Sequence, residues 1–461
     1  MGCTRVAAIH CMARPIPFYM LPRALLMRPA QDARSAAVSA VNGTSAGSAA
    51  ADAGSGEELA FAALRHRGFR AYFITTALAM MADNVEHVIS YWVIFEVFHS
   101  QALGGFAVLS HWLPFLFFSV YFGALADRFD TRRVIQVSML LFMGVSLAWG
   151  LLFVTNTIEL WHAIVLLVVH GLAGVLWVPG SQLLIHHIVG SEHLQSAVRL
   201  SSTSRFLGLL LGPAVGGGLM LALGPAYGLL LNVLIYLPLV WWLWKAPYRA
   251  RDRAGKDAAR RGVGFAATFA LMREVSGNRV IVSMIALAGL SSFFIGSIQP
   301  QMPEFAIDLG ADQADVKYSV LLAANAAGAV AGGLILESRG LLPANPRSAI
   351  VLAILWCLVM TGFAAAPTYP LAVALMVCAG FLNLTFSAMA QTLVQLNAPG
   401  ELRGRVIGLY NMANNGLRSF SGVTVGVLGS LIGIHWSLAA SAMALLALCI
   451  ALFAFAMRSG D

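Results

Sequence analysis

Long apolar stretches alternate with short polar ones along most of this chain. From residue 70 onward we count twelve apolar stretches, each of about 20 residues or more. Their approximate bounds are 70–95, 102–125, 134–154, 161–189, 196–222, 226–246, 279–303, 316–338, 347–366, 370–395, 405–432 and 436–457. A helix of ~20 residues crosses the ~30 Å hydrocarbon core of a bilayer, where only helices or closed barrels satisfy the backbone. Because barrel strands are shorter, the pattern predicts an all-α integral membrane protein with twelve transmembrane helices.

Arginine and lysine residues lie almost entirely in alternate loops. They precede the first stretch and follow the second, sixth, eighth, tenth and twelfth, whereas the opposite loops carry essentially none. Loops rich in Lys and Arg stay in the cytoplasm. The alternation agrees with an even number of spans and predicts that both termini are cytoplasmic, in a multi-pass protein of the bacterial inner membrane.

Composition supports a membrane protein and narrows its partners. Apolar residues make up 59% of the chain, charged residues 11%, and the mean hydropathy is +0.78, whereas soluble domains carry about 25% charged residues. The net charge of +8 comes from loops on one side, so we expect a lipid bilayer as partner and no nucleic acid. The five cysteines show no ligand spacing, so neither a disulfide framework nor a metal site is predicted.

Residues 1–64 differ from the rest of the chain, being rich in Ala, Ser, Gly and Arg, with the first acidic residue at Asp32. Residues 36–56 are of low complexity, which is typical of disorder. We expect a disordered or processed extension. Three interpretations of this extension are open: a mis-assigned start codon or disordered cytoplasmic tail, an organelle transit peptide, or a myristoyl anchor. The anchor has the least support, because position 6 is neither Ser nor Thr.

The rest of the chain divides into two similar halves. The predicted domains are a six-helix bundle over 65–247, a basic cytoplasmic linker over 248–264 and a second six-helix bundle over 265–458. An offset of 210 residues places Gly123 and Asp127 on Gly333 and Glu337. It also aligns a glycine pair of the fifth stretch with one of the eleventh, namely Gly212 and Gly216 with Gly422 and Gly426. One shared offset at separate places indicates an internal duplication.

A charged turn joins the second and third stretches. It reads Gly123-Ala-Leu-Ala-Asp127-Arg128-Phe-Asp130-Thr-Arg132-Arg133. It resembles the signature loop between the second and third helices of the major facilitator superfamily, with Asp130 where the family often has Gly. The resemblance implies two six-helix halves around a midplane site, and a gate in which Asp127 caps the start of the eleventh span.

The arginines of this turn have two interpretations. A carboxylate near a helix N-terminus gains roughly 0.3–1 kcal/mol, and Arg128, Arg132 and Arg133 would steady the Asp127 contact. Alternatively, Arg132 and Arg133 only enforce the topology. By the repeat and the resemblance, the expected gate also includes Glu337, Arg403 and Arg405.

A second gating candidate is the Gly-Pro segment of the fifth stretch. It contains Gly208, Gly212, Pro213, Gly216 and Gly217. Glycines four apart let two helices approach closely, and proline bends a helix. The segment resembles the Gly-Pro motif of facilitator antiporters, which is associated with export. Packing alone explains the glycines but not the proline.

The first stretch carries ionisable residues deep in the membrane. Asp83 lies about 13 residues into it, ~20 Å along a helix, and Asp83, Glu86, His87 and Ser90 share one face. Facing lipid, a charge there would cost about 2.5–3.5 kcal/mol or more, so this face points into the bundle. We expect Glu86 or Asp83 to take up a coupling proton, tuned by His87. The alternative is a structural network with Arg205 or Arg418.

Histidine 170 stands where drug antiporters of the superfamily carry arginine, in His170-x-x-x-Gly174. The difference is consistent with a different proton relay, with no relay, or with a histidine that is simply hydrogen-bonded in the core. Other polar residues within the apolar stretches are candidates to line the substrate cavity. They are Arg205, Asn325, Asn383, Gln391, Asn411, Asn414 and Arg418.

Four further segments resemble the enterobactin-exporter-like and macrolide-efflux-like branch of the superfamily. They are Ser100–Gly104, Leu113-Pro114, Leu194–Ala197 and Arg403–Val406. The resemblance implies a monomeric, proton-coupled exporter of amphipathic small molecules, siderophore-like or drug-like, that needs no cofactor. No phosphate-binding loop pattern occurs, which disfavours an ATP-driven pump.

Other functions remain open. A lipid-moving permease for lysophospholipids would share the fold, and an importer is disfavoured by the Gly-Pro segment. A receptor or membrane enzyme would be a different class of protein. We do not expect an enzyme, because we find no cluster of nucleophile, base and metal ligands near one surface.

Overall fold

The computed structural model describes residues 60–98, 101–248, 264–296, 302–310, 314–339, 341–421, 424–425 and 428–457. These residues belong to one compact unit, Glu57–Asp461. Most of the predicted N-terminal extension and of the basic linker lies outside the described residues. The short piece at 60–64 packs on the bundle, because Ala62 and Ala63 are buried and the Ala63 N–H donates to Ser196 Oγ at 3.0 Å.

The first half consists of helices that follow the first six predicted stretches. They are η1 (Ala62–Arg65), α1 (Arg67–Phe98), α2 (Gln101–Arg128), α3 (Thr131–Thr155), α4 (Leu160–Val189) and α5 (Leu194–Lys245). Helix α5 holds the fifth and sixth predicted spans, because Gly224, at φ 76°, interrupts it before Pro225. Glycine adopts this left-handed conformation without the clash of a Cβ atom, so the chain turns there.

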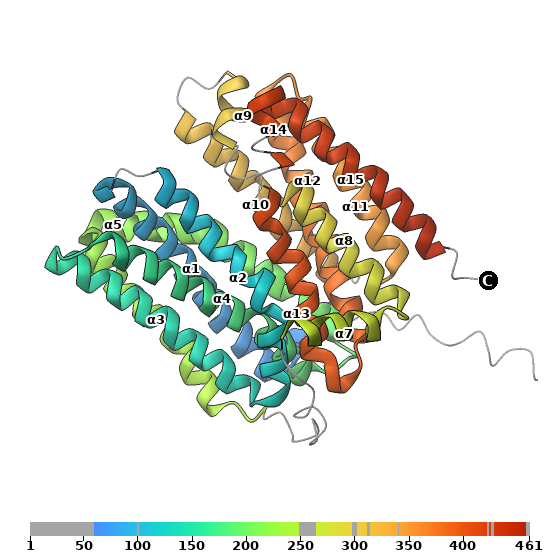
Figure 1. Ribbon diagram of the computed structural model, residues 1–461, viewed down its shortest axis with the longest axis horizontal. Helices are drawn as coiled ribbons and strands as arrows, with labels where there is room; N and C mark the ends of the chain where they lie inside the picture. The colour runs from blue at the N-terminus through green and yellow to red at the C-terminus, as the bar shows by residue number, and fades with distance from the viewer. Residues whose placement is uncertain are drawn as a thin grey trace, which may run out of the picture. The chain divides into compact units, whose positions relative to one another are not determined.

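The second half is also helical, and no strand occurs among the described residues. Its elements are α7 (Phe265–Val275), α8 (Arg279–Ile295), α9 (Met302–Asp308), α10 (Ala314–Arg339), α11 (Pro346–Ala364), α12 (Tyr369–Asn397), η3 (Gly400–Leu402), α13 (Arg403–Asn411), η4 (Met412–Gly416), η5 (Leu417–Phe420), α14 (Leu428–Ile432) and α15 (Ile434–Met457). Figure 1 shows α1–α5 in blue to green and α8–α15 in yellow to red. The all-α membrane fold predicted from the sequence is confirmed.

Eight helices of the described chain are long and apolar enough to cross a membrane. They include α5, which holds two predicted spans. Helix α1 is long enough but carries charged residues, and α8 has 17 residues. The eleventh predicted span is not one regular helix, because α13 passes into the π-helical η4 and the 3₁₀-helical η5. Short π-helical segments often mark functional sites.

Each half has its own apolar core. In the first half, Phe142 and Tyr236 stack with ring centroids 5.8 Å apart. In the second half, Trp356 packs against Phe386, 5.3 Å between centroids. The two cores meet where the halves touch, because the second core includes Val120 of α2 and the first includes Ala388 of α12.

Several helix pairs join the two halves, among them α5 with α12 and α4 with α13, and the two most extensive contacts are α2 with α13 and α5 with α10. Glycines make both contacts close. A Cβ atom at Gly123 would overlap the Gly404 carbonyl, and one at Gly333 would overlap the Thr203 hydroxyl. Figure 1 shows α2 and α13 side by side between the two bundles.

Candidate functional site

The first candidate site is a buried acid–imidazole network inside the first half. Helix α1 supplies Asp83 and, one helical turn later, the adjacent Glu86 and His87, so the three share one face as predicted. Glu86 is only 2% exposed and Asp83 is 9% exposed. Burying two carboxylates is costly unless other groups compensate for their charge, so their partners decide what the site does.

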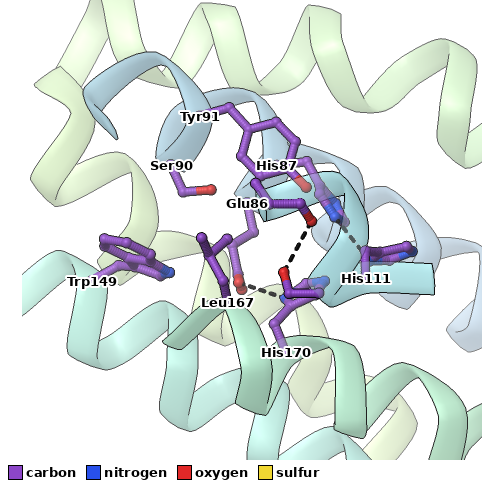
Figure 2. Close-up of a pocket in the computed structure, with 10 residues that line it drawn as sticks. Glu86, His87, Ser90, Tyr91, His111, Trp149, Leu167 and His170 are labelled. Atoms are coloured by element: carbon purple, nitrogen blue, oxygen red, sulfur yellow. Dashed lines mark hydrogen bonds and ion pairs between the residues drawn. The ribbon is translucent and has the colours of Figure 1, made fainter. Parts of the chain in front are cut away.

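Histidine 170 of α4 lies between the two carboxylates. Its Nδ1 is 2.7 Å from Glu86 Oε1, and its Nε2 is 3.1 Å from Asp83 Oδ1. Figure 2 shows Glu86 and His170 pointing toward one another. His170 is thus a buried histidine bonded to an acid of α1, a position open both to a proton relay and to a hydrogen-bonded core residue.

Helices α3 and α5 hold the Glu86 carboxylate from its other side. The Ser146 hydroxyl donates to Glu86 Oε2, and the Asn232 amide donates to Ser146 Oγ at 3.2 Å. The same amide donates to the Ala82 carbonyl at 2.9 Å. The carboxylate is therefore fixed by four helices, α1, α3, α4 and α5.

A third imidazole, His111 of α2, completes the network and was missed by the sequence analysis. His87 Nε2 lies 3.3 Å from His111 Nδ1, and the ring centroids of His87 and His170 are 4.6 Å apart. A signal for His111 exists in the sequence. His87 lies 11 residues before the end of α1 at Phe98, and His111 lies 10 residues after the start of α2 at Gln101, so the two helices bring them to the same depth.

A small cavity of about 10 Å³ adjoins the network, about the volume that one water needs. Ten residues line it, namely Glu86, His87, Ser90, Tyr91, Ala107, Ser110, His111, Trp149, Leu167 and His170. This cavity is too small for an organic substrate. The three imidazoles could also hold a metal ion, because one nitrogen from each lies within 4.8 Å of the others.

The second candidate site is the Asp127 latch, by which we mean the Asp127 carboxylate and the backbone N–H groups of Gly404 and Arg405. Gly404 N–H donates to Asp127 Oδ1 at 2.7 Å, and Arg405 N–H donates to Oδ2 at 3.0 Å. A carboxylate thus caps the first turn of α13 from the other half, the geometry expected from the resemblance.

A related contact joins α5 to α10 at the position predicted by the 210-residue offset. The Ser196 hydroxyl donates to Glu337 Oε1, and Arg199 Nη1 lies 3.8 Å from Glu337 Oε2. Gln195 adds two bonds to the chain after α10, from its amide to the Leu342 carbonyl at 2.7 Å and from Ala344 N–H at 2.8 Å. Both contacts therefore hold the two halves together through an acidic residue at the end of a helix.

Arg132 and Arg133 of the turn donate to groups other than Asp127. Arg132 donates through Nη2 to Asp130 Oδ2 at 2.6 Å and through Nη1 to the Ala246 carbonyl. Arg133 donates through Nη1 to Gln136 Oε1 at 2.8 Å. Although partial burial opposes its charge, the pKa of Asp130 is lowered by hydrogen bonds from Arg132 and its positive charge. Arg132 thus ties the turn to the end of α5.

Arginine 403 connects α13 to the first half. Its Nη1 lies 3.2 Å from His186 Nδ1 of α4, and its Nε donates to the Gln395 carbonyl at 3.2 Å. Arg405 contributes its backbone N–H to the Asp127 latch and is buried, at 7% exposure. These residues of the predicted gate lie together where the halves meet.

The Gly-Pro segment of α5 packs against α1. A Cβ atom at Gly208 would lie 2.8 Å from Met80 Cβ, and one at Gly212 would overlap Asn84. A Cβ atom at Gly216 would lie 3.3 Å from Val85 Cα, whereas one at Gly217 would have no atom within 4 Å. Close packing therefore accounts for three of these glycines and not for Gly217.

The predicted cavity residues are dispersed. Asn411 is fully buried and exchanges hydrogen bonds with Gln182 of α4 at 3.1 and 3.3 Å, so it lies in the contact between the halves. Asn325 donates to the Met376 carbonyl at 3.4 Å within the second half. Asn383 accepts from Ser387 at 3.2 Å, and the Asn414 carbonyl accepts from Ser292 at 2.5 Å.

Two arginines occupy the region between the halves. Arg205 of α5 is exposed. The Arg418 guanidinium lies 4.6 Å from the ring centroid of Trp112. Asp83 Oδ1 lies 3.1 Å from His170 Nε2, so the partner seen for this carboxylate is an imidazole, whereas the expected alternative was a structural network with Arg205 or Arg418. Gln391 is half-buried on α12.

Comparisons with known proteins agree with this architecture. A family model described as a transmembrane secretion effector matches residues 58–461. An uncharacterized MFS-type transporter of Bacillus subtilis, YfiS, is 27% identical over 167 residues, 34% of this chain and 39% of that protein. The chain thus matches less than half the length of this curated relative.

Solved structures share the fold at low sequence identity. The human organic anion transporter MFSD10 is 13% identical with a TM-score of 0.65, covering 84% of this chain and 99% of that one. The Escherichia coli fucose:proton symporter FucP is 13% identical with a TM-score of 0.64, covering 85% and 98%. At these identities the likeness concerns the fold alone.

Proposed function

The chain belongs to the transmembrane secretion effector family of the major facilitator superfamily, and on that premise we propose that it is a proton-coupled exporter of amphipathic small molecules. The family and the similar structures are transporters, so the chain is a transporter and not an enzyme. Siderophore-like or drug-like compounds are the proposed cargo.

Alternating access is supported above all by the Asp127 latch. Two backbone N–H groups at the start of α13 share one carboxylate from α2 at 2.7 and 3.0 Å. This contact crosses between the two halves, so it must break when they separate at that end. A contact of a few hydrogen bonds, each worth about 0.5–1.5 kcal/mol net, biases such an equilibrium without locking it.

Proton coupling is supported by the acid–imidazole network. Asp83, Glu86 and His170 are buried together in the middle of one half beside the half-buried His87, without a lysine or arginine in hydrogen-bond contact among the described residues. Intramembrane ionisable residues commonly mark proton relays. Uptake of a proton by a carboxylate would weaken its bond to His170 and alter the packing of α1 against α4.

Orientation and energy source follow from the same proposal. Loops rich in arginine, such as the turn at 127–133, stay in the cytoplasm, so both termini are cytoplasmic and the Asp127 latch closes the cytoplasmic side. We place the protein in the bacterial inner membrane as a monomer. It uses the proton gradient and needs no other cofactor, and its partners are the lipid bilayer and the exported molecule.

The proposal is tested by uptake of a fluorescent amphipathic cation and of a catecholate into everted vesicles with an imposed pH gradient, the direction that corresponds to efflux from the cell. Asp127→Asn should leave expression intact and abolish transport. The carboxylate accepts one bond on each of its two charged oxygens, whereas an amide is uncharged and has only one oxygen. Glu192→Gln, an exposed residue with 86% side-chain exposure, is the matched control and should transport normally. Full efflux by Asp127→Asn would reject the latch, and no gradient-dependent movement of either compound by wild type would reject this cargo class.

A further inference from the structure

In the acid–imidazole network, one nitrogen from each of the three imidazoles lies within 4.8 Å of the others, and Asp83 Oδ1 lies 3.1 Å from His170 Nε2. The candidate donor atoms are therefore His87 Nε2, His111 Nδ1, His170 Nε2 and Asp83 Oδ1. We infer that they bind one divalent transition-metal ion of the Zn²⁺ class in the first half of the protein. The inference is independent of export and of proton coupling, because it concerns equilibrium binding to the purified chain.

The spacing of the donors fits a tetrahedral ion. Two ligands 2.0–2.1 Å from Zn²⁺ at the tetrahedral angle lie about 3.3 Å apart. His87 Nε2 and His111 Nδ1 are 3.3 Å apart, and His170 Nε2 and Asp83 Oδ1 are 3.1 Å apart. These two pairs have the separations of opposite edges of one coordination tetrahedron.

Two of the four atoms lack hydrogen bonds. Asp83 Oδ1 and His170 Nε2 are buried and form no hydrogen bond with any described residue, although they are only 3.1 Å apart. Buried polar atoms are nearly always satisfied. A cation between these atoms would satisfy both at once.

The surrounding hydrogen bonds orient the rings for metal binding. His87 Nδ1 lies 2.7 Å from the Asp83 carbonyl, which only accepts, so the hydrogen is on Nδ1 and the Nε2 lone pair is available. His170 Nδ1 lies 2.7 Å from Glu86 Oε1, so its Nε2 lone pair is available in the same way. A carboxylate behind a ligating histidine is the usual second support of a metal site.

Charge balance also favours a divalent ion. Asp83 and Glu86 bring two negative charges into a buried region, and three neutral imidazoles bring none. A 2+ ion neutralises the site. Imidazole nitrogen with one carboxylate oxygen suits Zn²⁺ and its neighbours in the first transition row, whereas Mg²⁺ and Ca²⁺ prefer oxygen ligands alone.

The inference is tested on the full chain, purified without a histidine tag and stripped with a chelator. Calorimetric titration with Zn²⁺ should show one tight site. His111→Ala should weaken it more than about 100-fold, since loss of even a supporting residue typically costs 10–100-fold. His187→Ala, an exposed histidine of α4, is the control and should bind as wild type.

Titration of the wild type with Co²⁺ provides a measurement that needs no variant. The intense visible bands of tetrahedral Co²⁺ should rise to one equivalent and disappear when Zn²⁺ is added. Wild-type affinity in His111→Ala, or Co²⁺ spectra without tetrahedral bands, would overturn the inference. Because no gradient or cargo is present, either outcome leaves the export proposal to its own vesicle assay.

Discussion

At the residue scale, the chemistry of the buried network depends on His170 as much as on the acids of α1. Its ring is 5% exposed and reaches Asp83 and Glu86 with different nitrogens. Neither acid has an arginine at bonding distance among the described residues. A single imidazole therefore determines whether the two carboxylates respond separately or together.

Removing either charge of this network should uncouple transport. In Glu86→Gln and in Asp83→Asn the side chain keeps its size but no longer exchanges a proton, so we expect proton-driven flux to disappear. The measurement is proton movement reported by a pH-sensitive dye inside proteoliposomes when cargo is added.

Glu96→Gln serves as the control, because Glu96 is an exposed residue of the same helix. Proton-driven flux equal to wild type in both network variants would exclude these carboxylates from coupling.

At the scale of elements, glycine positions decide how closely helices approach. Gly208 and Gly212 lie against Met80 and Asn84, so the backbones of α5 and α1 are in close contact.

The eleventh predicted span shows another effect at the scale of elements. It changes from α-helix to π-helix at Met412, next to Asn411, whose side chain bonds to α4.

We expect Gly212→Ala to destabilise the protein by about 1–3 kcal/mol, the usual cost of overpacking, because the new methyl group would overlap Asn84. Gly217→Ala should be neutral or stabilising by up to ~1 kcal/mol, since alanine favours a helix and no atom lies near its Cβ. Thermal unfolding of the two purified variants measures the difference. Equal melting temperatures would contradict the inferred contact.

At the scale of the whole described unit, two contacts between the halves are closed at the same end. The Asp127 latch joins α2 to α13, and Glu337 joins α10 to α5. Their pairing follows the repeat, because Asp127 and Glu337 are 210 positions apart. Because these two contacts close one end, any opening between the halves in this state lies at the opposite end.

Widening the contact between the halves should open the closed end. A Cβ at Gly408 would overlap the Ser119 carbonyl and lie 2.8 Å from Val120 Cα, so Gly408→Ala should shift the equilibrium by roughly 1–3 kcal/mol, about 5- to 150-fold. Spin labels at positions 192 and 338 report the separation of the halves. The expected result is a new population at longer distances.

Gly144→Ala is the control for this experiment, because no atom lies within 4 Å of its Cβ position. An unchanged distance distribution in Gly408→Ala would show that this contact does not set the equilibrium.

The sequence by itself determined the fold class, the family and the face of α1 that carries Asp83, Glu86 and His87. Hydrophobic length, charge alternation and helical spacing are local properties, and each is readable from one chain. The turn at Asp127 was recognisable for the same reason, since its residues are contiguous.

Only the tertiary structure decided which distant residues meet. His111 and His170 join the acids of α1 through the packing of three helices, and the rotation of each helix about its axis is fixed by contacts far away in the chain. The predicted cavity residues dispersed because an isolated asparagine in an apolar stretch does not reveal which neighbour it faces. The π-helical segment begins next to Asn411, which bonds to Gln182 of the other half, and no local pattern indicated that contact.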